Sequence, residues 1–188
     1  MRKLSFEESL RKYEVDEEII NKIMSVPYDK DENRRQNQAN FMCAVLKKSE
    51  ELLDNDVLIK VRSESPCAIT GKTLENSKKF AKDNADKSLA EKLELLHMVS
   101  LATPQFTDEK YFEVVICNRM DVCPCPCLRG CKPKDDVMPL SYCYCCAGNI
   151  RFHYQKVLGA KIRIVKMVST ITSSNGTKPC IAVFEIVK

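Results

Sequence analysis

Cysteine is the residue type whose number and spacing in this chain could do chemistry. Seven of the eleven cysteines fall between residues 123 and 146. They stand in two groups, Cys123-Pro124-Cys125-Pro126-Cys127-Leu128-Arg129-Gly130-Cys131 and Cys143-Tyr144-Cys145-Cys146. Packing alone explains such a dense group poorly, because closely spaced thiols bind metal ions or oxidise. The sequence therefore predicts a metal or thiol site in this stretch.

The predicted metal ligands are the two Cys-x-Cys pairs, Cys123 with Cys125 and Cys143 with Cys145. Four thiolates bind zinc tetrahedrally at about 2.3 Å, which places neighbouring sulfurs roughly 3.8 Å apart. The prolines between and after the first pair fix φ and remove N–H donors, so they favour a curved loop over a ladder strand. The second pair is expected at a helix N-terminus, where free N–H groups and the helix dipole stabilise thiolate.

Other residues have secondary roles in this interpretation. Cys127 and Cys67 are held as reserve ligands. Three cysteines fit better as small buried apolar residues: Cys43, Cys117 and Cys146. Four basic residues are near enough in sequence to offset the charge of a four-thiolate zinc site: Arg119, Arg129, Lys132 and Lys134.

Zinc is the leading cofactor, but other thiol chemistry stays open. The spacing Cys-x-Cys-x-Cys-x3-Cys falls short of the ferredoxin pattern, which makes an iron–sulfur cluster the weaker alternative, and a reversible dithiol pair is a third. His153 follows Cys145 by eight residues, about 12 Å along a helix, so the two cannot share a metal. We expect His153 to be a helix-surface residue or one with satisfied hydrogen bonds. No Gly-x-Ser-x-Gly motif occurs, and a conventional hydrolase is not indicated.

The composition is that of a folded chain with little net charge. Of the 188 residues, 44% are hydrophobic and 30% charged, and 30 basic against 26 acidic residues give a net charge of +4. No basic stripe with interleaved aromatics occurs, so we expect no nucleic acid partner. No apolar run follows Met1-Arg2-Lys3, and no stretch reaches the roughly 18 apolar residues of a membrane span. We therefore expect a cytoplasmic protein with reduced thiols and no membrane partner.

The first hundred residues are predicted to be mainly helical. Asp16 is the expected N-cap of the second helix, and Ser88-Leu89-Ala90-Glu91 is a capping box that opens the last one. For residues 57–62 the pattern is too short to distinguish a strand from a continued helix. Helices are expected over residues 5–13, 16–26, 39–53, 73–81 and from residue 88 onward.

The last third changes to the alternating pattern of strands. Strands are expected over residues 111–117, 161–168 and 180–187, the last two joined by a turn at 173–176. A helix with Ser141 as its N-cap should run to Leu158 and stop at Gly159. These elements predict an α+β fold with a helical N-terminal half over residues 1–105. Residues 106–188 should form an antiparallel sheet covered by helix, with a cysteine-rich loop, and the two regions should pack as one unit.

The order of motifs in the last third resembles an uncharacterised family of cysteine-rich bacterial and archaeal proteins. That family is similar at its C-terminus to the 4-vinyl reductase domain, a small-molecule-binding module. The resemblance covers roughly residues 110–188, and before residue 105 it rests mainly on Cys67 with Gly71-Lys72. It implies an α+β ligand-binding fold and a site formed by the two Cys-x-Cys pairs, but no reaction. The residues that carry it are Cys123-Pro124-Cys125-Pro126, Cys143-Tyr144-Cys145, Gly148, Leu158-Gly159, Gly176 and Cys180.

We therefore predict a protein that binds a metal, with zinc favoured, and that binds or senses a small molecule. The alternative is a metal- or thiol-dependent enzyme that acts on a small substrate at the cysteine-rich loop, and the sequence does not decide between them. A third reading is partner binding through the helical half. A small-molecule ligand and a homodimer both fit the pattern, but ligand, reaction and the role of the helical half are not encoded in any motif.

Overall fold

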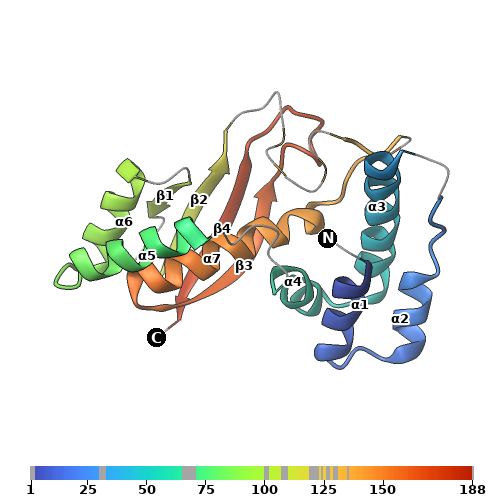
Figure 1. Ribbon diagram of the computed structural model, residues 1–188, viewed down its shortest axis with the longest axis horizontal. Coiled ribbons are helices and arrows are strands. Elements are labelled where there is room, and N and C mark those ends of the chain that lie inside the picture. The colour runs from blue at the N-terminus through green and yellow to red at the C-terminus, as the bar shows by residue number, and fades with distance from the viewer. Residues whose placement is uncertain are drawn as a thin grey trace.

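Helices make up most of the N-terminal half, and a sheet makes up the C-terminal half (Figure 1). The computed structural model describes residues 3–29, 33–64, 71–99, 102–106, 110–118, 123, 125, 128, 131–134 and 136–187. Within these residues the chain forms seven α-helices, one 3-10 helix and one four-stranded antiparallel sheet. The predicted α+β class is confirmed.

Four helices form the N-terminal group, and their apolar faces pack on one another. Asp16 is the N-cap of α2 as predicted, and its side chain accepts a hydrogen bond from the Glu18 N–H at 2.7 Å. The undecided residues 57–62 belong to a helix, α4, which begins after a break at Leu53 and Asp54. The helices are α1 (Lys3–Lys12), α2 (Glu17–Met24), α3 (Arg34–Leu52) and α4 (Asn55–Ser63). Their buried side chains include Phe6, Leu10, Ile20, Ile23, Val45, Leu46, Leu58 and Val61.

A helical pair, α5 (Gly71–Asp83) and α6 (Leu89–Val99), connects this group to the sheet. The predicted capping box is confirmed: Ser88 Oγ accepts from the Glu91 N–H at 3.3 Å, and the Glu91 carboxylate accepts from the Ser88 N–H at 2.8 Å. None of the helices in the described ranges is both long and apolar enough to cross a membrane.

The sheet has the strand order β1-β2-β4-β3. Strands β2 (Tyr111–Cys117), β3 (Lys161–Ser169) and β4 (Cys180–Val187) match the prediction, whereas β1 (Thr103–Phe106) was not predicted. The alternation of β3 places Ile162 and Ile164 inside and leaves the residues between them exposed. Strand β2 shifts its register on β4 between Val115 and Cys117, and such irregularities re-aim side chains at sheet ends.

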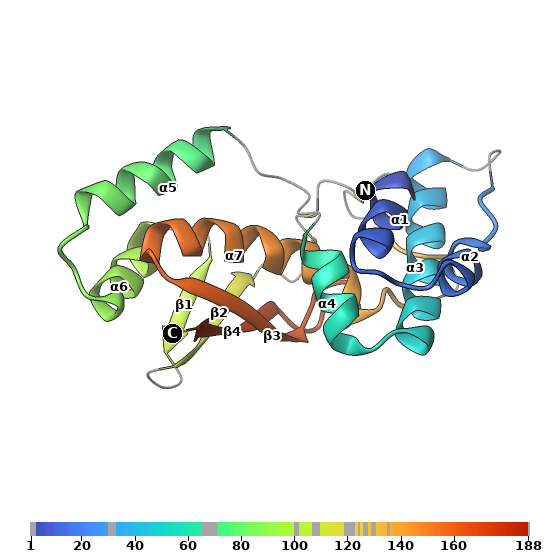
Figure 2. The ribbon, with the colours of Figure 1, turned by 90° about the horizontal axis from the view of Figure 1, so that it is seen from below.

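One long helix, α7 (Tyr144–Leu158), lies along one face of the sheet (Figure 2). The prediction of Ser141 as its N-cap is wrong. A 3-10 turn, η1 (Leu140–Cys143), starts after Pro139, and Cys143 takes the N-cap position. Gly159 ends the helix as predicted, with φ of 65° in the left-handed region that glycine adopts without strain.

Both halves of the chain contribute to one connected core. On the sheet side, Phe112 stacks on Phe184 at 5.4 Å and on Tyr154 of α7 at 6.1 Å between ring centroids. At its N-terminal end α7 instead meets α4, where Gly148 faces the backbone of Ser63. The start of α7 is therefore held between the helical group and the sheet.

Candidate metal centre

Six cysteines gather where the end of β2, the start of β4 and the start of α7 come together. Strands β2 and β4 are antiparallel, so the last residue of one meets the first residue of the other. Cys125 and the turn before α7 lie together, since Cys125 Sγ is 3.2 Å from the Tyr142 hydroxyl. We give the name thiol cluster to the cysteines of this region, without implying contact between their sulfurs: Cys117, Cys123, Cys125, Cys143, Cys145 and Cys180.

Cys117 and Cys180 face each other across β2 and β4, directly after the register shift. The backbone N–H of Ile171 donates to Cys180 Sγ at 3.3 Å. Its neighbour Thr172 lies beside Cys143, with 3.6 Å between Thr172 Oγ1 and Cys143 Sγ. The turn after β3 thus contacts a strand cysteine and a helix cysteine at once. The sequence predicted that Cys117 is a small buried apolar residue, and it gave no sign that Cys117 faces Cys180.

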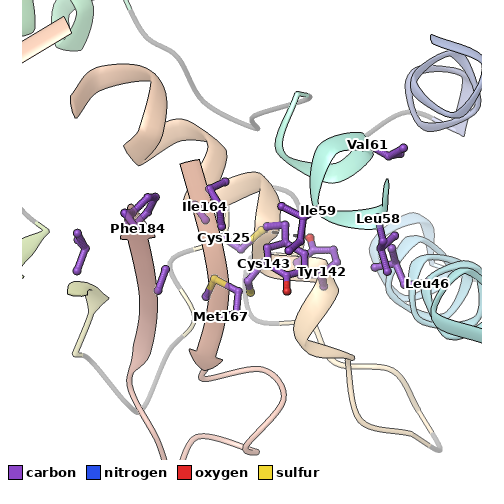
Figure 3. Close-up of a cluster of buried hydrophobic side chains, with 14 of the residues drawn as sticks. Leu46, Leu58, Ile59, Val61, Cys125, Tyr142, Cys143, Ile164, Met167 and Phe184 are labelled. Atoms are coloured by element: carbon purple, nitrogen blue, oxygen red, sulfur yellow. Dashed lines mark hydrogen bonds between the residues drawn. The ribbon is translucent and has the colours of Figure 1, made fainter. Parts of the chain in front are cut away.

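Tyr142 links the loop cysteines to the helix cysteines. Its hydroxyl lies 3.2 Å from Cys125 Sγ, and its carbonyl oxygen accepts from Cys145 Sγ at 3.5 Å. Figure 3 shows Cys125, Tyr142 and Cys143 together in the core, with Met167 of β3 beside them. Three of the four predicted ligands therefore lie in or beside one buried turn, and Cys123 precedes Cys125 on the loop that enters it.

Burial keeps the thiols of Cys123, Cys143 and Cys180 protonated near pH 7, because it raises the pKa of each. Burial raises the pKa of Cys123 to about 11, and the nearby thiols of Cys125, Cys180 and Cys117 add to the rise. Burial likewise raises the pKa of Cys143 well above its ordinary range, and the thiol of Cys145 adds to the rise. The predicted stabilisation of thiolate by the α7 N-terminus is therefore outweighed by desolvation.

The donor set suits a soft metal ion, although the sulfurs are not yet arranged around one. Within the described part of the chain, no three side chains of histidine, cysteine, aspartate or glutamate form a set that could hold a metal as they stand. Thiolates are the ligands that zinc and other soft metals prefer.

The other cysteines lie outside this cluster or outside the described residues. Cys43 is buried in α3, and its Sγ donates to the Val137 carbonyl at 3.5 Å, in line with the predicted structural role. Cys131 contacts Gln36 at 3.7 Å, and Cys146 is half-buried on α7. The reserve ligands Cys67 and Cys127 fall outside the described residues.

A buried arginine from the helical half lies against the thiol cluster. Arg62 of α4 is only 1% exposed, and its guanidinium donates to the carbonyl oxygens of Tyr142 at 2.5 Å and Ser141 at 3.4 Å. It also lies 5.4 Å from the centre of the Tyr142 ring, within cation–π range. Of the predicted counter-charges, Lys132 and Lys134 are exposed and Arg119 and Arg129 fall outside the described residues. The burial of Arg62 could not be predicted from the helical pattern, because charged residues on helices are normally solvated.

A pocket of about 600 Å³ lies between α5, α6, α7 and the end of β2. Much of its wall is apolar and includes Phe80, Leu96, Ile116, Ile150 and Val157. His153 of α7 also lines it. The expectation of a helix-surface histidine is therefore wrong, since His153 is 7% exposed.

The hydrogen bonds of His153 fix its tautomer. Ser77 Oγ donates its one hydrogen to the Thr73 carbonyl at 2.9 Å, so it must accept from His153 Nδ1 at 2.9 Å. His153 Nε2 is then an acceptor, and it has no hydrogen-bond partner in the described part of the chain. Burial, followed by the charge of Lys156, lowers the pKa of His153, which keeps the imidazole neutral.

Comparison of the chain with models of protein families, with curated proteins and with solved structures finds no match. The resemblance to the 4-vinyl reductase domain therefore stays a prediction.

Proposed function

We propose that this protein binds zinc through Cys123, Cys125, Cys143 and Cys145. The observation that carries the proposal is that one cysteine of each Cys-x-Cys pair, Cys125 and Cys145, contacts Tyr142 in the same buried turn. When bound, zinc supplies a charge that keeps the cysteines as thiolates, which the buried environment does not favour by itself. Arg62 places a second positive charge behind Tyr142.

A metal site built of thiolates requires reduced cysteines, so we propose a reducing compartment such as the cytoplasm. We favour a binding or sensing role over an enzyme. A structural zinc site has four protein ligands, whereas a catalytic one keeps a position open for water or substrate. The enzyme alternative therefore predicts that one of the four cysteines can be changed to serine with zinc retained and an activity lost.

The metal proposal is tested by elemental analysis of the protein, purified without added metal, and of four Cys→Ser variants. We expect stoichiometric zinc in the parent protein. Loss of a residue that only hydrogen-bonds to a metal ligand typically lowers metal affinity about 10–100-fold. Loss of a ligand itself should therefore lower zinc affinity by more than roughly 100-fold. Absence of zinc from the parent protein contradicts the proposal, and an iron–sulfur absorption spectrum would favour the other cofactor.

Cys43→Ser is the matched control for these variants. Cys43 is buried like the proposed ligands, but it bonds to the Val137 carbonyl away from the thiol cluster. The control should retain the zinc of the parent protein. If Cys43→Ser loses zinc as readily as Cys143→Ser, general destabilisation rather than ligation explains the loss.

A second candidate function, small-molecule binding, is favoured by the pocket beside α7. The pocket is large enough for a small organic molecule, and its wall combines apolar side chains with a few polar ones, as ligand sites do. The neutral His153 lines the pocket, and its buried Nε2 is an acceptor that a ligand reaches only if a neighbouring side chain moves. A ligand that fits both features has an apolar body and a hydrogen-bond donor such as a hydroxyl group.

The ligand class is tested with 2-naphthol and its ether 2-methoxynaphthalene, in which a methyl group replaces the hydrogen that the oxygen donates. Calorimetric titration should show tighter binding of the alcohol by about tenfold, the worth of one hydrogen bond of roughly 1.4 kcal/mol. His153→Phe should remove this preference while keeping the apolar wall. Lys79→Met, at the pocket wall, should keep it. Equal affinities for the two probes, or a preference that survives His153→Phe, would count against the assignment.

A further inference from the structure

Cys117 and Cys180 face each other at the ends of β2 and β4, and neither is a proposed zinc ligand. They are partners in the antiparallel ladder, directly after the register shift between Val115 and Cys117. Facing residues of an antiparallel pair have Cα atoms about 4.5–5.5 Å apart, and their side chains lie on the same face of the sheet. A disulfide needs a Cα separation of about 4.4–6.8 Å. The backbone therefore holds these two cysteines at a spacing that a disulfide can bridge.

The strand ladder selects this pair over the other cysteines of the thiol cluster. Those cysteines lie on loop, turn or helix and bond to different groups: Cys125 Sγ lies 3.2 Å from the Tyr142 hydroxyl, and Cys143 Sγ lies 3.6 Å from Thr172 Oγ1. Within the part of the chain that the structure describes, only β2 and β4 among the strands carry a cysteine, and each carries one.

The two facing thiols differ in how they are held. Cys117 is half-buried, whereas Cys180 is only 6% exposed. The backbone N–H of Ile171 donates to Cys180 Sγ at 3.3 Å, and such a bond favours the thiolate form against the effect of burial. Cys117 is therefore the thiol that a reagent from solvent meets first, and Cys180 is the thiol that can displace the reagent from it.

We propose that Cys117 and Cys180 form a reversible disulfide between β2 and β4, which makes this pair a redox-sensitive site. The proposal goes beyond the zinc function and does not require it. Facing side chains on paired strands keep their Cβ atoms about 4.5–5.5 Å apart, whereas a disulfide draws them to about 3.8 Å. Closure therefore strains the strand ends, and a strained disulfide is readily reduced. This suits a reducing compartment, where disulfides are transient.

A small disulfide such as oxidised glutathione is the oxidant. The Cys117 thiolate attacks one of its sulfurs, a mixed disulfide forms, and one glutathione thiolate leaves. The Cys180 thiolate then attacks the Cys117 sulfur, the cross-strand bond forms, and the second glutathione thiolate leaves. The two cysteines lose two electrons and two protons, and the two glutathione molecules gain them as thiols.

The test uses the full chain, reduced and kept free of metal with a chelator, so that its outcome does not depend on zinc binding. One equivalent of oxidised glutathione is added, free thiols are blocked by alkylation, and disulfide-linked peptides are identified by mass spectrometry. We expect the main product to join Cys117 to Cys180, both in the parent protein and in Cys43→Ser, and dithiothreitol to restore both thiols. A main product that links other cysteines, or a pair that stays reduced, overturns the proposal.

Cys180→Ser separates the two chemical steps. Serine cannot displace glutathione, so Cys117 should accumulate as the mixed disulfide in this variant, whereas the parent protein should pass through it without accumulation. Accumulation of the same mixed disulfide in the parent protein would show that Cys180 does not reach the Cys117 sulfur. That result overturns the proposal without any variant having to fold.

Discussion

We expect Gly148→Ala to destabilise the protein more than the addition of one methyl group at any other position that we can identify. A Cβ at this position would lie 2.1 Å from the carbonyl oxygen of Ser63 and within 3.0 Å of its Cα and carbonyl carbon. These are backbone atoms at the end of α4, so relief requires α4 and α7 to move apart. We expect a loss of about 3 kcal/mol, at the upper end for overpacking. For a chain of this size that is a fall of roughly 10 °C in Tm, measurable by thermal denaturation.

Gly159→Ala is the matched control for this prediction. Its φ of 65° disfavours alanine, but a Cβ there meets no atom within 4 Å. The left-handed conformation alone costs about 1–2 kcal/mol, so its Tm should fall by much less. Equal losses in the two variants would mean that the close approach of α7 to α4 contributes nothing. A small loss in Gly148→Ala would mean the same.

Arg62→Met is expected to destabilise the junction between the helical half and the thiol cluster. The guanidinium connects α4 to the carbonyl oxygens of Ser141 and Tyr142, and it lies 5.9 Å from the ring of Phe6 in α1. Methionine fills similar space but donates no hydrogen bond. Because bonds to a charged donor are worth about 1.5–3 kcal/mol, we expect a loss of about 3 kcal/mol in chemical denaturation.

Two further variants separate the role of the guanidinium from that of charge alone. Arg62→Lys keeps the charge without the planar fork, so it should recover only part of the stability. Arg151→Met removes a partly exposed ion pair with Glu64 and should cost at most about 1 kcal/mol. If Arg62→Met is as mild as Arg151→Met, the buried guanidinium does not anchor Tyr142. If it anchors Tyr142, zinc affinity should fall in Arg62→Met as well.

Most secondary-structure elements could be predicted from the sequence, because their signals are local. The alternation over Tyr111–Cys117 and Cys180–Val187, the capping box at Ser88 and the stop at Gly159 each lie within a few residues, and each is confirmed. The N-cap of α7 was misplaced because Ser141 is a good capping residue by type. The 3-10 turn after Pro139 uses Cys143 instead.

Some residues of the candidate site could also be predicted from the sequence, whereas others could not. The sequence by itself determined the two Cys-x-Cys pairs, because dense cysteines with intervening prolines are visible without any knowledge of the fold. Only the tertiary structure placed Cys180 beside Cys117, which precedes it by 63 residues and faces it across β2 and β4.

Arg62 and His153 were likewise decided by tertiary packing. Each lies on a helix where its residue type predicts solvent, and each is buried because another element covers it: Arg62 by η1 and α1, and His153 by α5. Local pattern fixes which face of a helix is polar, but the burial of a polar group depends on which partner supplies its hydrogen bonds. That partner lies 79 or 80 residues away for Arg62 and 76 residues away for His153.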